Sequence, residues 1–457
     1  MSALIFSIVL GIIVLYLGFT KNKAILSPVA VAGLGVSLIL SIKDWGLGSR
    51  YFHDMILLDN FSIAFNISMI IITILIFLFG IDYYETMEFH VAEHYALMLF
   101  ALTGAFLMTS FSNLIMLFLG IEILSIPLYV LAGGKKYSYR SNEASFKYFM
   151  LGSFATAIFL FGIALVYGAS ATFYLPEIKT YIAQFNGHLP PMLMVGLLFI
   201  LIGVAFKVAA APFHFWSPDV YEGAPTLVTA FMATVVKTAG FAAFYRLLGM
   251  GLLPLPVQLE KALWVMTWLT LLIGNLGALK QTNFKRLLAY SSISHSGFIM
   301  LAMLSQHDSS ASVLLYYTFV YSLATVPLFI IFIMAKRASD GMEELSIFRG
   351  LYKEKPWIAV FAIILLMSLA GIPPTSGFMA KYQVFVLSIS QGILLTSIFA
   401  IVMAIIGVYY YFFVIREIFT DREQSNRFVV SKINGALIVA CSIAVLFMGI
   451  FMWRLPI

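Results

Sequence analysis

The chain alternates between long apolar runs and short polar connections. A helix needs about 20 apolar residues to cross roughly 30 Å of hydrocarbon, and this criterion predicts fourteen membrane spans. The seventh and the twelfth contain proline and glycine and are predicted to be interrupted. The spans are expected near 3–20, 24–42, 61–81, 94–110, 112–132, 144–168, 191–212, 225–249, 261–280, 285–304, 311–335, 357–389, 392–415 and 433–453.

Composition supports a polytopic, all-α membrane protein. Hydrophobic residues make up 62% of the 457 residues and charged residues 11%, whereas soluble domains carry about 25% charged residues. The net charge of +6 does not indicate a nucleic-acid partner, because the basic residues lie in short loops. Cys441 is the single cysteine, which excludes a disulfide framework and a cysteine-ligated cluster. The first run, without a basic leader or cleavage site, is expected to be a span and not a removed signal.

The distribution of basic residues predicts the orientation. The loops after the odd-numbered spans carry 18 Lys and Arg residues, and the opposite loops with both termini carry 6. By the positive-inside rule, both termini lie outside a bacterial inner membrane, in the periplasm of a Gram-negative cell. Residues 43–60 are predicted to be the one connection on that side long enough to form a small hairpin.

When the basic residues at the span ends are counted with the loops, few ionisable residues remain inside the membrane. They are Glu122, Lys207, Lys237, His295 and Lys381. A charged side chain at the centre of a span costs about 2.5 to 3.5 kcal/mol, so three lysines and one acid cost on the order of 10 kcal/mol unless they are paired or hydrated. A protein with a purely structural role has little reason to carry them, which favours ion transport.

The spacing of these residues predicts an internal repeat. Glu122 precedes Lys207 by 85 residues, and His295 precedes Lys381 by 86. Five spans separate the equivalent positions, and an odd number requires that the repeat be inverted, as in transporters with discontinuous helices. Spans 4–8 and 9–13 are therefore expected to form two inverted five-helix repeats. The predicted domains are 1–93, 94–250, 251–418 and 419–457.

Each interrupted span carries a cluster of helix-breaking residues. Non-helical backbone at membrane depth persists only where it lines a cavity or is buried in protein. His214 and Trp216 are predicted to shape the first break, without direct proton transfer by either. The predicted break and cavity residues are Pro212, His214, Trp216, Pro218, Gly223, Pro225, Gly371, Pro373 and Pro374.

Each ionisable residue has a functional and a structural interpretation. Glu122 and Lys207 are candidates for a buried ion pair, while the alternative is that Glu122 binds a small polar neighbour and fixes helix packing. Lys237 has no acid in its own segment, and a buried lysine is able to exchange protons; the alternative is that its amine reaches toward the interface. His295 lies within a serine-rich run that is able to hold water, or it is a packing residue with satisfied hydrogen bonds.

One apparent metal motif is set aside. Residues 90–94 read HVAEH, a spacing known from zinc proteases, but no third ligand is evident and the motif lies at the start of a span. There is no glycine-rich phosphate loop and no nucleophile elbow. We therefore expect no metal and no cofactor in this chain.

Four sequence blocks resemble a known family. These blocks read FLGIEILSIPLYVLAG, FKVAAAPFHFWSPDVYEGAPTLVTAFMATVVKTAGF, QTNFKRLLAYSSISHSGF and SLAGIPPTSGFMAKYQVF. They are similar to the subunit N family of bacterial NADH-quinone oxidoreductase, respiratory complex I. Its relatives are the L and M subunits and the large subunits of Mrp-type cation/proton antiporters. Three features favour N over these relatives: the loop SPDVYEGAP, the lack of a lateral helix after span 14, and the lysine at position 381.

The resemblance implies an antiporter-like, proton-translocating subunit of the membrane arm. It implies a Glu122–Lys207 pair, Lys237 as the lysine of span 8, His295 on a central hydrated axis and Lys381 as the lysine of span 12. NAD, FMN, iron–sulfur clusters and quinone are then expected in partner subunits, with M-type and K-type neighbours and the lateral helix of the L subunit as contacts. The alternatives are a Mrp-type antiporter subunit and a scaffold whose charges only hold subunits together.

Overall fold

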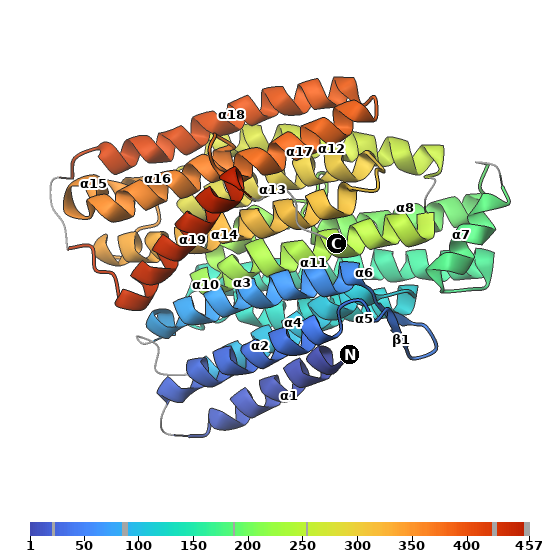
Figure 1. The fold of residues 1–457 in the computed structure, drawn as a ribbon, viewed down its shortest axis with the longest axis horizontal. Helices are drawn as coiled ribbons and strands as arrows, with labels where there is room; N and C mark the ends of the chain where they lie inside the picture. The colour runs from blue at the N-terminus through green and yellow to red at the C-terminus, as the bar shows by residue number, and fades with distance from the viewer. Residues whose placement is uncertain (21–22, 85–89, 186–187, 253–254, 423–426, 452–457) are drawn as a thin grey trace.

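The computed structural model describes residues 1–20, 23–84, 90–185, 188–252, 255–422 and 427–451, and the end of the predicted last span lies outside these ranges. Long helices run side by side along one common direction (Figure 1). Within the described residues, eleven helices are long and apolar enough to cross a membrane. The predicted class, a polytopic all-α membrane protein, is confirmed.

The first half of the chain begins with three helices that pack beside the rest of the bundle. These are α1 (Ser2–Leu17), α2 (Leu26–Lys43) after the short η1 (Lys23–Ile25), and α3 (Asn60–Tyr84). They are followed by α4 (Val91–Ser110), α5 (Leu114–Ala132), α6 (Tyr139–Ser170), α7 (Leu175–Ala183), α8 (Pro191–Lys207), α9 (Trp216–Gly223), α10 (Thr226–Phe231), the π-helix η2 (Met232–Val236), α11 (Lys237–Leu247) and the π-helix η3 (Leu248–Leu252).

The second half has a similar order of elements. It contains α12 (Val257–Leu279), α13 (Phe284–Leu304), α14 (Ser310–Ala338), η4 (Leu345–Phe348), α15 (Leu351–Glu354), α16 (Pro356–Ala370), α17 (Ser376–Ser390), α18 (Leu394–Phe419) and α19 (Lys432–Ile450). Local residues set several of the helix starts. The Asn113 side chain accepts the Ile115 amide at 2.8 Å, the Asn283 side chain accepts the Arg286 amide at 3.2 Å, and Pro191 and Pro356 occupy first turns.

Two helices are interrupted at membrane depth. α8 ends at Lys207 and helical structure resumes at Trp216. α16 ends at Ala370, where Gly371 adopts φ +84°, a left-handed conformation that terminates helices, and α17 begins at Ser376. Of the predicted break residues, Pro212 and His214 lie in the first gap, and Gly371, Pro373 and Pro374 lie in the second. Trp216, Pro218 and Gly223 lie instead within the short helix α9 (Trp216–Gly223), and Pro225 directly precedes α10.

The connections on the side of the N-terminus differ in part from prediction. Residues 43–60 contain the expected hairpin, with β1 (Ser49–Tyr51) antiparallel to β2 (Ile56–Leu58). The prediction that this was the only long connection there is wrong, because residues 171–190 hold the extra helix α7. α7 buries Leu175, Ile178 and Ile182 on one face, and this three-to-four-residue spacing is that of an amphipathic helix.

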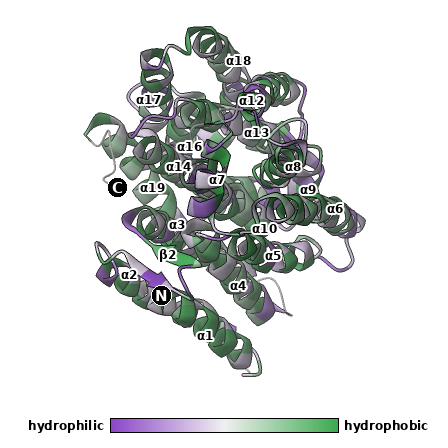
Figure 2. Ribbon diagram, turned by 90° about the vertical axis from the view of Figure 1, so that its right-hand side faces the viewer, coloured by the Kyte–Doolittle hydropathy of each residue, from purple (hydrophilic) through white to green (hydrophobic). Residues whose placement is uncertain are grey.

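Burial increases toward the centre of the bundle. α13 and α14 are almost entirely buried, whereas α6 and α18 expose rows of large apolar side chains, including Phe154 and Ile405. The helices consist largely of hydrophobic residues, and hydrophilic residues are found mainly in the connections and near the helix ends (Figure 2). This pattern is expected when the surrounding solvent is lipid. The central position of α13 matters most for the site.

Candidate functional site

The end of α8 is held next to the first break by aromatic residues. The Trp216 indole Nε1 donates to the Phe206 carbonyl at 3.0 Å, and its ring stacks on Tyr148 at 4.7 Å between centroids. The Lys207 ammonium lies 6.0 Å from the centre of the same Tyr148 ring, within range of a cation–π contact. Trp216 therefore holds the end of the helix that carries Lys207.

Lys207 and Glu122 share an environment without a direct ion pair among the residues described. Lys207 Nζ donates to Ser125 Oγ at 2.7 Å, and Glu122 accepts a hydrogen bond from Thr156 Oγ1 at 2.9 Å. Glu122 and Ser125 are one turn apart on α5. A cavity of about 10 Å³ is lined by Ser125, Tyr129, Thr156 and Lys207, which is room for about one water molecule.

Lys237 binds neutral oxygen atoms of α13. Its ammonium contacts both the carbonyl and the hydroxyl oxygens of Ser292, and the residue is 4% exposed. It is the first residue of α11, directly after the π-helix η2. Such wide turns occur often at functional sites. No ion pair involving Lys237 is present in the described part of the chain.

His295 lies in a chain of hydroxyl groups. Its Nδ1 is 2.7 Å from the Tyr317 hydroxyl and its Nε2 is 3.3 Å from the Tyr411 hydroxyl, which also contacts Ser291 Oγ. All these side chains are buried. Hydrogen bonds on both ring nitrogens fix the orientation of the imidazole, and a chain of hydroxyl groups is able to pass protons.

Lys381 is held by the second break. Its ammonium donates to the carbonyls of Leu369 at 3.2 Å and Ala370 at 2.8 Å, the last carbonyls of α16. The Phe298 ring of α13 lies 5.0 Å from the ammonium. These carbonyls lack helical partners and carry the negative end of the helix dipole, so they stabilise a cation.

α13 joins the separate residues into one polar axis. Ser292, which binds Lys237, lies one turn from both His295 and Ser296. The Ser296 hydroxyl donates to the carbonyl of Val208, the residue after Lys207, at 2.9 Å. Of the predicted site residues, Lys237, His295 and Lys381 thus lie on or against α13, and Lys207 directly precedes Val208, which contacts α13. Glu122 lies farther out between α5 and α6.

Several partners of the lysines were not identified from the sequence. Ser125, Thr156, Tyr317 and Tyr411 contact the predicted residues, but isolated hydroxyl residues in apolar spans have no distinctive pattern. Ser292 belongs to the serine-rich run around His295. His214, assigned to the first break, is 4% exposed, and its Nδ1 has no hydrogen-bond partner within the described ranges.

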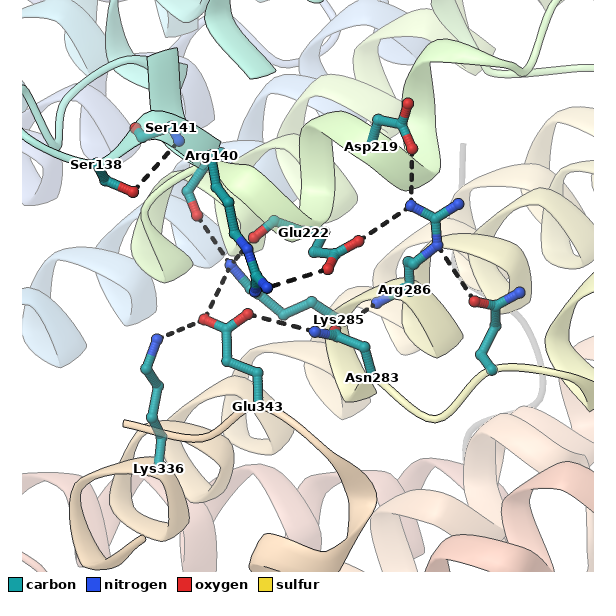
Figure 3. Close-up of polar contacts among 12 residues, drawn as sticks. Ser138, Arg140, Ser141, Asp219, Glu222, Asn283, Lys285, Arg286, Lys336 and Glu343 are labelled. Carbon is teal, nitrogen blue, oxygen red and sulfur yellow. Dashed lines mark hydrogen bonds and ion pairs between the residues drawn. The ribbon is translucent and has the colours of Figure 1, made fainter. Parts of the chain in front are cut away.

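A charged network connects the two halves at the basic side of the bundle (Figure 3). Asp219 of α9 accepts from Lys147 and from Arg286, each at 2.7 Å. Burial raises the pKa of the Asp219 carboxyl, but these two hydrogen bonds outweigh burial and hold the pKa below its usual range. Glu343, before η4, pairs with Lys285 and Lys336. Burial raises the pKa of Glu343 too, and the two lysines lower it below the usual range.

The residues of the apparent zinc motif have other partners. His94 Nδ1 lies 3.0 Å from the Tyr84 hydroxyl, and the exposed His90 lies 3.3 Å from Glu93. Among the residues described, no group of three or more His, Cys, Asp or Glu side chains is placed to hold a metal ion.

Lysines buried beside interrupted helices and joined by hydroxyl groups are features of ion-translocating membrane proteins. Residues 111–407 match the sequence profile of a family described as "NADH:quinone oxidoreductase/Mrp antiporter, TM". The chain is thus an antiporter-like membrane protein. It is 39% identical, over 93% of its length and 92% of the relative's, to NADH-quinone oxidoreductase subunit N of Cytophaga hutchinsonii. The chain belongs to the subunit N family of NADH-quinone oxidoreductases.

Solved structures agree with this assignment. A chain of respiratory complex I from Thermus thermophilus is 31% identical and superposes with a TM-score of 0.83, over 98% of this chain and 96% of that one. A chain of the Mrp complex from a Dietzia species has a TM-score of 0.85 at 21% identity, over 98% and 94%. The match to the Mrp complex shows a shared fold. The higher sequence identities to the Cytophaga subunit N and to the complex I chain favour the subunit N assignment.

Proposed function

We propose that this chain translocates protons along the axis built on α13, as the antiporter-like subunit N of a bacterial NADH-quinone oxidoreductase. The observation that carries the proposal is the environment of Lys237. It is buried in the middle of the bundle and bound by the carbonyl and hydroxyl of Ser292. An amine solvated only by neutral oxygens is able to lose its proton at much lower energetic cost than one paired with a carboxylate.

The proposed mechanism couples Lys237 to its neighbours by charge. NADH oxidation and quinone reduction in other subunits change the local field, and Glu122 and Lys207 approach or separate. Lys207 directly precedes Val208, whose carbonyl accepts a hydrogen bond from Ser296 of α13. We propose that a change in the charge environment of Lys207 alters the proton affinity of Lys237 through this helix. The proton then moves through His295 and leaves outward from Lys381.

We propose the following membrane arrangement. The eleven long helices and the shorter apolar helices α1, α8 and α16 support an arrangement of fourteen spans. The two interrupted helices support inverted repeats over spans 4–8 and 9–13, with domains 1–93, 94–250, 251–418 and 419–457. Both termini face the periplasm, and the basic loops face the cytoplasm.

We further propose that the redox groups lie in partner subunits. NAD, FMN, iron–sulfur clusters and quinone would bind there, and this chain would contact M-type and K-type neighbours and the lateral helix of the L subunit. Identification of the subunits that co-purify with this chain tests both the partners and the Mrp-type alternative.

The decisive test of function is the variant Lys237→Ala in the complete complex. We expect normal assembly and a loss of NADH-driven proton pumping of at least roughly tenfold, because a buried proton carrier is removed. Pumping in inverted membrane vesicles is compared with the amount of assembled complex. Wild-type pumping by this variant would disprove the mechanism. Normal assembly with lost pumping would exclude the scaffold alternative.

A further inference from the structure

Lys285 is a fourth deeply buried lysine, and it lies at the basic end of α13. It is 1% exposed. Its ammonium donates to the backbone carbonyls of Glu222 and, at 3.0 Å, Ala224, in the segment between α9 and α10. Its one carboxylate partner in the described chain is Glu343, at 3.6 Å. The amine is therefore held mainly by neutral oxygens, like those of Lys237 and Lys381.

Glu343 contacts both the buried Lys285 and the more exposed Lys336. Its Oε1 contacts the Lys336 ammonium more closely than that of Lys285, while its Oε2 accepts from Asn283 at 3.4 Å (Figure 3). The Lys336 side chain is 21% exposed and that of Lys285 1%. One carboxylate thus faces two cations, and a small movement decides which of them it neutralises.

A cavity lies beside Lys336, the more exposed member of the cluster. Its volume is about 460 Å³, and its lining includes Lys135, Lys336 and Thr226. Thr226 is fully buried, and its hydroxyl has no hydrogen-bond partner within the described ranges. A polar cavity of this size holds water, and water is the natural partner of such a hydroxyl.

Lys285 and the residue that binds Lys237 lie on the same helix, α13. Ser292, the residue that binds Lys237, follows Lys285 by seven residues, so the two lie on one face of α13 about 10 Å apart along the helix. The phenol of Tyr221 faces Ser292. Glu222, whose carbonyl binds Lys285, is the next residue in the chain. The Tyr221 phenol and the Ser292 hydroxyl therefore lie at the Lys237 end of this interval.

We propose that Lys285 takes up protons from the basic side and passes them toward Lys237, with Glu343 as its movable counter-ion. The neutral amine accepts a proton from hydronium in the cavity and leaves water behind. When Glu343 turns to Lys336, the ammonium loses its counter-charge and gives the proton, through water and hydroxyl groups, to the neutral amine of Lys237. This step deepens the proposed function and rests on it.

A charge-conserving variant separates this role from a structural one. Lys285→Arg keeps the positive charge and the donors for Glu343 and the carbonyls, but an arginine does not lose its proton in proteins. In the complete complex we expect assembly on native gels, unchanged NADH oxidation by an artificial acceptor, and a decrease in proton pumping of roughly tenfold. Wild-type pumping by an assembled Lys285→Arg complex would overturn the proposal.

Glu343→Gln provides a second measurement that does not depend on fitting a larger side chain. Its matched control is Glu417→Gln, because Glu417 is also a mostly buried glutamate that pairs with a basic residue, Arg349, at 2.6 Å. We expect pumping to fall several-fold in Glu343→Gln and to remain near wild type in Glu417→Gln. Equal pumping by the two variants would overturn the proposal, whether or not Lys285→Arg assembles.

Lys237→Ala, measured in parallel, distinguishes a failure of the uptake site at Lys285 from a failure of the proposed function. If Lys237→Ala loses pumping while Lys285→Arg and Glu343→Gln retain it, protons reach Lys237 by another route and only the uptake site is wrong. If Lys237→Ala retains pumping, the proposed function itself fails.

Discussion

At the scale of single residues, the buried lysines share an environment of neutral oxygen atoms. Lys207 binds a serine hydroxyl, Lys237 a serine, and Lys381 two helix-terminal carbonyls. A buried lysine locked to a carboxylate would remain charged, whereas these groups stabilise the ammonium without binding its proton irreversibly. The arrangement suits residues that must change charge during each cycle.

Gly371 offers a test of how closely the second break holds Lys381. A Cβ atom at this position would lie 2.7 Å from Lys381 Cδ, and the φ of +84° is strained for any other residue. We expect Gly371→Ala to lower stability by about 1 to 3 kcal/mol and also to reduce pumping. Thermal unfolding in detergent and pumping in vesicles measure the two effects.

Gly392→Ala is the matched control for this prediction. Gly392 also has a positive φ, +75°, but no atom lies within 4 Å of its added Cβ. This variant carries the backbone strain without displacing a lysine, so its pumping per assembled complex is expected to be normal. A similar loss in both variants would contradict a specific role for the contact with Lys381.

The sequence predicts which residues are unusual but not what they touch. The three lysines are recognisable because charge is rare in long apolar runs. The Lys207 hydroxyl partner, Ser125, lies 82 residues earlier in the chain, and only the packing of α5 and α8 against α6 brings the two together. The Glu122–Lys207 pair remains a prediction for another state of the cycle, because Glu122 binds Thr156 in this one.

At the scale of elements, the segment between α8 and α10 connects the two halves of the bundle. Asp219 of α9 binds Lys147 of α6 and Arg286 of α13. Proline and glycine clusters made both interruptions predictable. The helix α7 and the π-helix before Lys237 were not predicted, because a short amphipathic pattern and a one-residue widening of a helix are weak signals in an apolar sequence.

Asp219→Asn tests this connection through its pH dependence. The pKa of Asp219 is depressed in the folded protein, so its stabilisation is present above its ordinary value of 3.8 and is lost as the pH falls through the lower folded value. We expect a loss of about 1 kcal/mol at neutral pH, since the pairs are partly exposed.

The difference in melting temperature between wild type and Asp219→Asn should therefore shrink below pH 3.8. Asp54→Asn is the control, because the Asp54–Arg50 pair is largely exposed and connects no helices. A pH-independent difference for Asp219→Asn would show that the carboxylate charge is not the stabilising factor.

At the scale of the whole molecule, a buried arginine attaches the N-terminal helices to the remainder. Arg246 of α11 makes two hydrogen bonds of 3.0 Å to Asp59 and donates to the Phe111 carbonyl at 2.7 Å. Asp59→Asn leaves the guanidinium buried without a counter-charge, and we expect a loss of about 3 kcal/mol. The double variant Asp59→Asn, Arg246→Met removes both charges and should recover part of the lost stability. A double-mutant cycle measures this recovery.

The orientation is a further prediction at this scale. Cys441 is buried, so an introduced cysteine will dominate labelling by a membrane-impermeant maleimide. We expect Lys136→Cys, in a basic loop, to react in inverted vesicles, and His53→Cys, in the hairpin, to react in right-side-out cells. The reverse pattern would show that the positive-inside assignment is wrong.

The small cavity beside Lys207 also has a consequence for energy storage. Its volume of about 10 Å³ admits roughly one water molecule. A continuous file of water across the bundle would let the proton gradient discharge whenever the respiratory chain is idle. On the proposed mechanism, close packing at this point provides electrical insulation between turnovers, and conduction requires that the packing loosen.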